Sequence, residues 1–358
     1  MSLLLVGLLA RPEMLAALDL QGVPATLKGR LQGGARAGID AGGWPRLADG
    51  PEALPAVQVG ANAALARYAE VMGVPEREVN GRRVLGASAG PRAEGAGAPL
   101  PQQARLAAEI ARQILKAPAG LPAAELAGRL PMIGTWAASR LRAAAGAASG
   151  GEIVRRRAAD EVELHDDAEP FTGYFALRRP ILRHSRHDGG CSPRLSREVF
   201  MMGDAVVVLP WDPRRDRVLL IEQFRAAPLL RADPQPWMLE AVAGRVDAGE
   251  TPEEAANREA REEADLALSR LIPVLGTYPS PGAVGEFHYH YVGIADLPDG
   301  TGGIHGLAEE AEDIRGHLLP RHRLEEMVLA GQIPNGPLAM IVLWLRAEAE
   351  QLRKALEP

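Results

Sequence analysis

Three glutamates in the second half of the chain stand close enough together to bind a cation. Glu259, Glu262 and Glu263 are three and four residues apart, so on a helix their carboxylates converge on one side. Like charges at this spacing destabilise a helix, and we expect a cation to compensate them. Carboxylate oxygens are hard ligands, the type that Mg²⁺ or Mn²⁺ prefers. Arg258 lies among them and can reach back to Glu250.

The same segment carries the signals that begin a helix. Thr251 is a good N-cap, Pro252 suits the first helical position, and Glu254 completes a capping box. Three alanines four residues apart form a small apolar face that can pack close to a sheet. They are Ala256, Ala260 and Ala264. An acidic helix face exposed to water is the alternative interpretation, because charge runs usually lie on solvent-exposed faces.

Residues 244–266 resemble the Nudix box, Gly-x5-Glu-x7-Arg-Glu-U-x-Glu-Glu-x-Gly-U, where U is apolar. The residues that match are Gly244, Glu250, Arg258, Glu259, Ala260, Glu262, Glu263 and Leu266. One position departs, because Asp265 stands where the family has the glycine that ends the helix at positive φ. Aspartate tolerates the left-handed region better than most residues, so the departure affects local geometry more than metal binding. This specific pattern makes the solvated acidic face the weaker interpretation.

The resemblance extends over roughly residues 170–350, to the ADP-ribose pyrophosphatase branch of Nudix enzymes. The segments that carry it are Gly173–Leu177, Arg197–Phe200, Leu209–Pro213, Ile221–Arg225, Pro236–Gly244, Ser280–Gly282 and Gly303–Asp313. It implies an α/β/α sandwich that hydrolyses the pyrophosphate bond of ADP-ribose to AMP and ribose 5-phosphate with Mg²⁺, or with Mn²⁺ in its place. Another nucleoside diphosphate derivative, such as NADH or a nucleotide sugar, is the alternative substrate. A sensor that binds ADP-ribose without hydrolysing it is the alternative from outside the enzymes.

The resemblance also implies roles for individual residues. Glu259 and Glu263 are the main metal ligands, assisted by Glu262 and the Ala243 carbonyl. The candidates for the catalytic base are Glu310 and Glu312 on a loop, with Glu262 as a third.

Four further residues are implied to bind the substrate. Arg225 holds its phosphates, Tyr174 stacks on adenine, and Glu286 contacts the terminal ribose or a metal-bound water. Arg197 of the partner subunit completes the site, so a homodimer is expected. Three of the residues named above have a structural alternative: Tyr174 as a core residue, Arg225 in a surface ion pair, and Glu312 as a solvated loop residue. Trp237 is expected in the core.

Composition divides the chain into two α/β parts. A smaller mixed α/β domain is expected over residues 1–147 and the Nudix domain over residues 151–358, separated by a Gly- and Ala-rich linker. In the first part, residues 102–146 carry helical patterning. In the second, apolar runs at 205–209 and 218–221 flank a turn and predict a hairpin, and a long helix is expected over 338–356.

The N-terminal part resembles the γ-glutamylcyclotransferase-like fold only faintly. That family has an apolar strand ending in Tyr-Gly-Thr/Ser-Leu, whereas this chain reads Val6-Gly7-Leu8-Leu9, and Glu70 stands near its acid/base position. We expect a degenerate, non-catalytic relative. The whole arrangement resembles bacterial tellurite-resistance-associated Nudix proteins.

Charge and cysteine content restrict the partners and the compartment. The net charge is −6, so no basic field is available to bind nucleic acid. The chain contains no run of about 18 apolar residues, so the sequence predicts no membrane span. A single cysteine, Cys191, excludes an intramolecular disulfide and favours a reducing compartment, so we expect a cytoplasmic protein.

Overall fold

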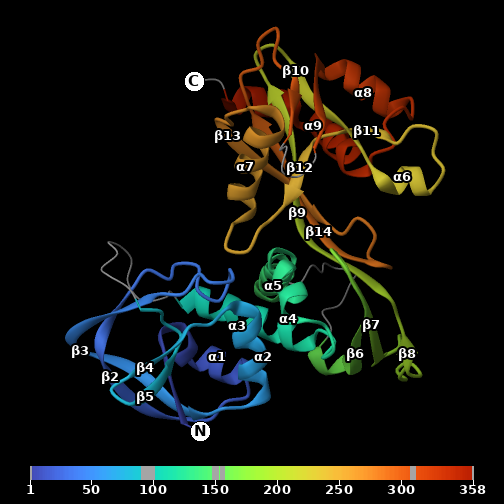
Figure 1. Cartoon of the computed structure of the whole chain (residues 1–358). Helices are drawn as coiled ribbons and strands as arrows, with labels where there is room; N and C mark the ends of the chain where they lie inside the picture. The colour runs from blue at the N-terminus through green and yellow to red at the C-terminus, as the bar shows by residue number, and fades with distance from the viewer. Residues whose placement is uncertain (1, 90–100, 147–152, 154–157, 307–311, 357–358) are drawn as a thin grey trace. The chain divides into compact units, whose positions relative to one another are not determined.

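The structure is a computed structural model of the chain, and its described part comprises residues 2–89, 101–146, 153, 158–306 and 312–356. Two compact units contain these residues. The first unit comprises Met1–Met202 with Asp247–Gly249, and the second comprises Gly203–Val246 with Glu250–Pro358. The colours of Figure 1 follow the chain through both. The units divide near residue 202, whereas the predicted domain boundary lies at residues 147–151 and stays a prediction.

A mixed sheet forms the N-terminal part of the first unit. Its strands follow the order β2-β3-β1-β5-β4, and β1 is parallel to β5 but antiparallel to β3. These strands are β1 (Ser2–Val6), β2 (Gly22–Gln32), β3 (Arg46–Gly60), β4 (Glu76–Val79) and β5 (Arg82–Leu85). The short helices beside them are η1 (Gly7–Ala10), α1 (Pro12–Ala17) and α2 (Ala63–Met72). The prediction of mixed α and β structure here is confirmed.

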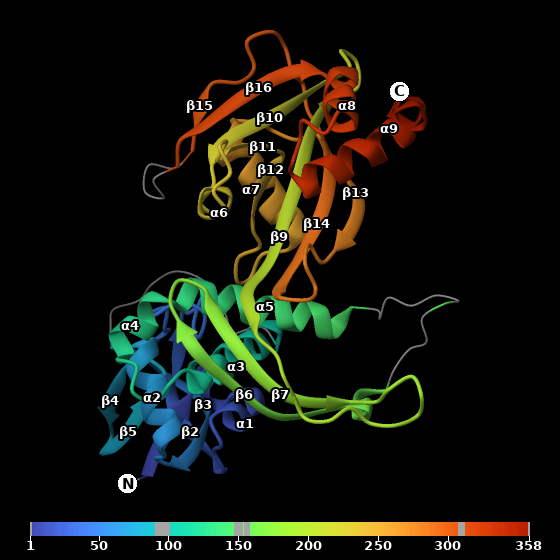
Figure 2. The same ribbon diagram turned by 90° about the vertical axis from the view of Figure 1, so that its right-hand side faces the viewer.

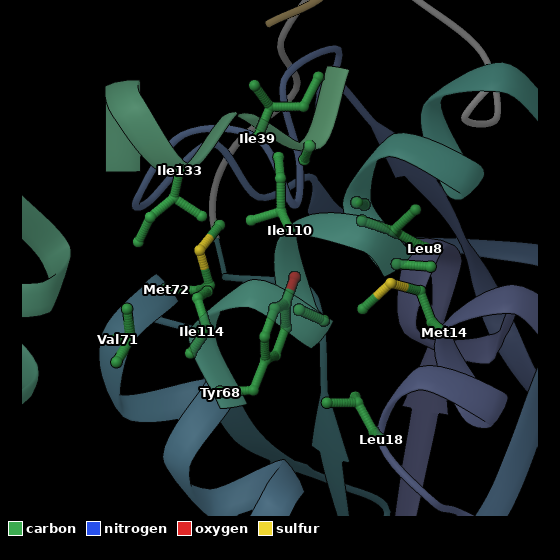
Figure 3. Packing of buried hydrophobic residues seen from close by; sticks show 14 of the residues in the cluster. Leu8, Met14, Leu18, Ile39, Tyr68, Val71, Met72, Ile110, Ile114 and Ile133 are labelled. Atoms are coloured by element: carbon green, nitrogen blue, oxygen red, sulfur yellow. The ribbon is translucent and has the colours of Figure 1, made fainter. Parts of the chain in front are cut away.

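The helical patterning of residues 102–146 is confirmed, but the segment contains three helices. They are α3 (Pro101–Lys116), α4 (Ala123–Gly128) and α5 (Leu130–Ala145). Pro118 and Pro122 interrupt the pattern, because proline lacks the N–H that a helix interior needs. Figure 3 shows the resulting core, in which Tyr68 extends from α2 among Ile110, Ile114 and Leu18. Among the described helices, none is long and apolar enough to cross a membrane.

A long hairpin completes the first unit. Strand β6 (Val162–Thr172) follows η2 (Ala159–Glu161) and pairs antiparallel with β7 (Ala176–His184), which also pairs with β8 (Leu195–Ser196). Figure 2 shows this hairpin passing alongside the helices of the same unit. Its residues Phe175 and Ala176 join the hydrophobic core that α3 and α5 build. The hairpin and the preceding helices are therefore packed as one body.

The sheet of the second unit is built around β9 (Val199–Asp212), whose first residues still belong to the first unit. Its main path follows the order β13-β14-β9-β10-β16-β15, with β11 on β10 and β12 on β9. The strands are β10 (Arg217–Phe224), β11 (Trp237–Glu240), β12 (Val242–Arg245), β13 (Arg270–Thr277), β14 (Val284–Ile294), β15 (Ile304–His305) and β16 (Ile314–Pro320). Arg217 pairs with Asp212 across β9 and β10, which confirms the predicted hairpin.

Helices cover both faces of this sheet. They are α6 (Ala226–Leu230), α7 (Pro252–Ala264), α8 (Arg321–Leu329) and α9 (Gly336–Leu356). Val206 and Val208 of β9 pack with α7, whereas Val207 and Leu209 pack with α9, because successive strand side chains point to opposite faces. Figures 1 and 2 show α7 and α9 on opposite sides of the strands. The predicted α/β/α sandwich is confirmed.

One core prediction is wrong. Trp237 is 50% exposed, and its ring contacts Phe224 edge-on at 5.5 Å between centroids. It stands at the first position of the short strand β11, where the cross-strand partner is Phe224. The burial of Trp237 was predicted from its apolar character alone. The residue begins strand β11 at the surface of the second unit, so its ring stays exposed.

Candidate active site

Helix α7 has the ends that its sequence predicts. The Thr251 hydroxyl accepts a hydrogen bond from the Glu254 backbone N–H at 3.2 Å, and Oε2 of Glu254 accepts from the Thr251 N–H at 2.8 Å. The helix ends at Asp265, which has φ 51° and ψ 38° in the left-handed region. Ala256, Ala260 and Ala264 are buried against the sheet. The opposite ends of the helix are thus set by local chemistry and its orientation by the alanine face.

Strand β12 and α7 approach each other so closely that a side chain at Gly244 would displace the Glu259 carboxylate. A Cβ atom built on Gly244 would lie 1.9 Å from Oε1 of Glu259 and 2.1 Å from its Cδ. The Glu259 carboxylate therefore lies directly over the backbone of β12. Beside it, the Ala243 backbone N–H donates to Oε2 of Glu263 at 2.9 Å, and Glu263 is 3% exposed. The structure thus places Ala243 and both glutamates together.

Arg258 binds three of the carboxylates on this side of α7. Its Nε and Nη2 donate to the two oxygens of Glu250 at 2.8 and 3.0 Å, and its Nη1 donates to Glu259 at 2.7 Å and to Glu262 at 3.0 Å. Nη2 also donates to the Arg245 carbonyl at 3.0 Å. The hydrogen bonds to Glu250 raise the pKa of Arg258 further above its usual range. Arg258 is therefore the internal cation that partly compensates the clustered charges.

The negative charges of Glu259 and Glu263 are not fully balanced by neighbouring positive charges. Burial raises the pKa of Glu263 to about 8, and the neighbouring charges of Glu259 and Glu312 add to the shift. Burial likewise raises the pKa of Glu259 to about 7, against the opposing effect of Arg258. Glu263 is buried and Glu259 half-buried, and such mutually repelling carboxylates are stabilised when a divalent cation binds between them, so these donors fit Mg²⁺. Within the described residues, however, no three His, Cys, Asp or Glu side chains already converge as a metal site.

Arg225 lies on the same side of the second unit. Its positive charge lowers the pKa of Glu263, which shows that the two are within electrostatic reach. Nε and Nη2 of Arg225 donate to Oε2 of Glu240 at 2.9 and 2.6 Å, and Asn335 donates to the other oxygen at 3.0 Å. Glu240 was not among the residues predicted from the sequence to act in the site. The sequence signals Glu240 only as an acidic residue in a short apolar strand. Its partners Arg225 and Asn335 are 15 and 95 residues away in the chain, so local sequence does not indicate them.

Three further predicted site residues, Glu286, Glu310 and Glu312, lie outside α7. The charge of Glu312 adds to the rise in the pKa of both Glu259 and Glu263. Glu286 lies on β14 and contacts Nε2 of His288 at 3.2 Å. His288 and His290 both lie on this strand. Glu310 lies outside the described residues.

The first unit holds the other two predicted substrate residues. Tyr174 is exposed in the turn between β6 and β7 and is not a core residue. Arg197 is also exposed, directly after β8, where its Nη1 donates to the Ser196 carbonyl at 2.9 Å. Within the second unit, the structure brings together Ala243, Glu259, Glu262, Glu263, Glu312 and Arg225.

Comparison with known proteins agrees with this arrangement. The family described as NUDIX domain matches residues 201–337, which include α7 and the strands around it. An ADP-ribose pyrophosphatase of Escherichia coli strain K12 is 40% identical over 194 residues, which cover 54% of this chain and 92% of that protein. An ADP-ribose pyrophosphatase of Haemophilus influenzae is 36% identical over 197 residues, covering 54% of this chain and 90% of that protein.

A more distant relative has a different named substrate. A GDP-mannose pyrophosphatase of Enterobacter sp. strain 638 is 30% identical over 186 residues, covering 52% of this chain and 95% of that protein. All these relatives are pyrophosphatases by name, and each is matched over nearly its full length. With the glutamate pattern of α7 in place over the matched segment, this chain belongs to the Nudix family of hydrolases and is related there to the ADP-ribose pyrophosphatases.

Proposed function

We propose that this protein hydrolyses the pyrophosphate bond of ADP-ribose to AMP and ribose 5-phosphate in the presence of Mg²⁺ or Mn²⁺. The observation that carries the proposal is the pair of buried Glu263 and half-buried Glu259 beside the backbone of β12, with Arg225 within electrostatic reach. Two raised carboxylate pKa values that Arg258 offsets only in part favour a divalent ion, and an arginine beside them favours a phosphate group.

Each residue in the second unit has a distinct proposed task. Bound divalent ions would screen the diphosphate and acidify a water molecule. Glu259 and Glu263 would hold them, with help from Glu262 and the Ala243 carbonyl. Arg225 would bind phosphate oxygens, and Glu240 keeps its guanidinium oriented through two hydrogen bonds.

Water addition across the anhydride needs a proton acceptor. Glu312 is suited to accept the proton, because its charge acts on both Glu259 and Glu263. Glu310 and Glu262 are the other candidates. Glu262 already accepts a hydrogen bond from Arg258 at 3.0 Å, so one of its oxygens is engaged. The oxygen of water joins one phosphorus, the bridging oxygen leaves with the other, and two phosphomonoesters result.

The test is a turnover panel with purified full-length protein over ADP-ribose, GDP-mannose and NADH. Each substrate is assayed with Mg²⁺, with Mn²⁺ and with EDTA, and products are separated by ion-exchange chromatography. We expect metal-dependent release of AMP from ADP-ribose with the highest kcat/KM of the three. A higher kcat/KM for GDP-mannose would transfer the assignment to nucleotide sugars. Binding of ADP-ribose without turnover under both metals would make the protein a sensor.

A further inference from the structure

Glu240 holds one edge of the Arg225 guanidinium. Nε and Nη2 of Arg225 both donate to Oε2 of Glu240, at 2.9 and 2.6 Å. Within the described residues Nη1 of Arg225 makes no hydrogen bond, and the Arg225 side chain is 42% exposed. A guanidinium is planar and carries its donors in fixed directions. The residue that fixes Glu240 therefore also fixes the direction of the Nη1 donors, which are left for an anion.

Asn335 holds the Glu240 carboxylate from its other oxygen. Nδ2 of Asn335 donates to Oε1 of Glu240 at 3.0 Å, while Oε2 accepts from Arg225. The Glu240 side chain is only 12% exposed, so water competes little for these oxygens. Because each oxygen has a different partner, the carboxylate can rotate only if a hydrogen bond breaks. Asn335 thus acts on Arg225 through Glu240.

The start of α9 fixes Asn335 in turn. Asn335 stands at the N-cap position, where its Oδ1 accepts from the Leu338 backbone N–H at 2.9 Å. Leu338 is fully buried among the residues that pack α9 on the sheet. Pro334 and Pro337 restrict the backbone on either side of Asn335, because each proline fixes its own φ. Since the cap uses the amide oxygen, the amide nitrogen is left to donate to Glu240.

We propose that Asn335 is a positioning residue for Arg225, which joins the N-terminus of α9 to the phosphate-binding guanidinium through Glu240. This inference rests on the proposed function, in which Arg225 binds the substrate phosphates. All three residues belong to the second unit, as do the metal-binding glutamates of α7. A guanidinium held in advance loses less side-chain entropy on binding, and it presents its donors where charge develops during hydrolysis. The effect of Asn335 should therefore appear in kcat/KM.

Two substitutions separate the amide nitrogen of Asn335 from its cap. Asn335→Ser keeps a side-chain oxygen that caps α9 but lacks the nitrogen that reaches Glu240, so its melting temperature should stay near that of wild type. We expect kcat/KM for the best substrate of the turnover panel to fall by about threefold to tenfold, the effect of one lost hydrogen bond. Asn335→Asp also keeps the cap, but it places a second carboxylate against Glu240. Its kcat/KM should fall further.

A double-mutant cycle on the full-length protein identifies the residue through which Asn335 acts. Arg225→Ala should lower kcat/KM by about 100-fold, because it removes a charged donor from the phosphate. Asn335→Ser added to Arg225→Ala should have no further effect, because the side chain that Asn335 positions is then absent. A purely structural role would instead lower kcat/KM by the same factor in both backgrounds.

Asn62→Ser is the matched control. Asn62 is the N-cap of α2, where its Oδ1 accepts from the Leu65 N–H at 2.8 Å and its Nδ2 donates to the Leu18 carbonyl at 2.8 Å. The substitution therefore also keeps a cap and removes one amide hydrogen bond, but these partners all belong to the first unit. Its kcat/KM should stay within about twofold of wild type. Circular dichroism melts of every variant report whether it folds.

The outcomes keep this inference apart from the proposed function. An unchanged kcat/KM in both Asn335 variants, a loss in Asn335→Ser that is equally large beside Arg225→Ala, or the same loss in Asn62→Ser would show that Asn335 is structural only. Turnover of ADP-ribose by wild type would still support the proposed function in each case. If Asn335→Ser does not fold, Asn335→Asp forms the same cycle. A wild-type protein that hydrolyses no substrate of the panel, or an Arg225→Ala variant with full activity, removes the proposed role of Arg225 and this inference with it.

Discussion

Glu263 is buried beside the Ala243 backbone, and burial raises its pKa from 4.5 to about 8. A folded-state pKa above the unfolded value means that the folded state binds the proton more tightly. The stabilising contribution of Glu263 to the free energy of unfolding is therefore fully present below about pH 4.5 and is lost as pH rises through about 8. Without metal, the ionised carboxylate destabilises the fold at alkaline pH, and the same ionised carboxylate is what a divalent cation binds.

Glu263→Gln should have opposite effects on activity and on stability. Loss of a metal ligand should reduce kcat by about 100-fold or more. In EDTA at pH 8.5, however, the variant should melt at a higher temperature than wild type, because glutamine carries no buried charge. At pH 4.5 the difference should shrink, since wild-type Glu263 is then protonated. Turnover and thermal melts at the two pH values measure both effects. Near-normal turnover at saturating Mg²⁺ would remove Glu263 from the metal site.

Gly244 tests how closely β12 must approach the metal ligands. A Cβ on Gly244 would lie 1.9 Å from the Glu259 carboxylate, so Gly244→Ala must displace that side chain. We expect activity to fall by about 10–100-fold, as when a ligand loses its support. Gly336→Ala is the control, because a Cβ there meets nothing within 4 Å. If Gly244→Ala keeps full activity at limiting Mg²⁺, the position of Glu259 does not matter for catalysis.

At the scale of elements, α7 depends on a left-handed residue at its end. Asp265 has φ 51° where the family has glycine. Asp265→Gly should change the free energy of unfolding by less than about 1 kcal/mol, because relief of the left-handed conformation opposes the greater freedom of glycine in the unfolded state. Asp265→Ala should destabilise by about 1 kcal/mol or more, since alanine has no such tolerance. Urea denaturation distinguishes these. A stable Asp265→Ala variant would mean that the helix end relaxes.

At the scale of the whole molecule, the resemblance implies a homodimer in which Arg197 of the partner subunit contacts the substrate. Mixing two inactive variants tests this. Glu263→Gln and Arg197→Ala are unfolded together and refolded, so that mixed dimers form. Each mixed dimer has one site with both residues intact, and random pairing in a two-fold dimer predicts recovery of about a quarter of wild-type activity.

Light scattering on the same samples reports the oligomeric state. No recovery from a sample that is dimeric would place Arg197 in the site of its own subunit or outside the site. A fully active monomer would contradict the homodimer itself.

We predict that the N-terminal end of the first unit does not catalyse γ-glutamyl cyclisation. Val6 and Leu8 are buried, and the faint resemblance to the γ-glutamylcyclotransferase-like fold puts them where that family has an aromatic and a hydroxyl residue. An apolar turn leaves the substrate's amino and carboxylate groups unpaired, at about 1–3 kcal/mol for each group. Full-length protein should release no 5-oxoproline from γ-glutamyl dipeptides. Release that Glu70→Gln abolishes would show that this region is catalytic.

The sequence alone determined the features that depend on local chemistry. The capping residues Thr251 and Glu254 predict the start of α7, and the three- and four-residue spacing predicts that its glutamates share a side. Two apolar runs that flank a turn predict the β9–β10 hairpin. These features arise within one or two helical turns or within one hairpin, so neighbouring residues suffice to specify them.

Only the tertiary structure decided which distant residues meet. Glu240 binds both Arg225 and Asn335, and Arg129 reaches Gly173 across 44 positions of the chain. The packing of the β6–β7 hairpin on α3 and α5, and the exposure of Trp237, were equally absent from the local pattern. Such contacts follow from strand register and from which helix face meets which sheet. Periodicity shows that a residue is apolar or charged, but it does not specify the partner that packing brings to it.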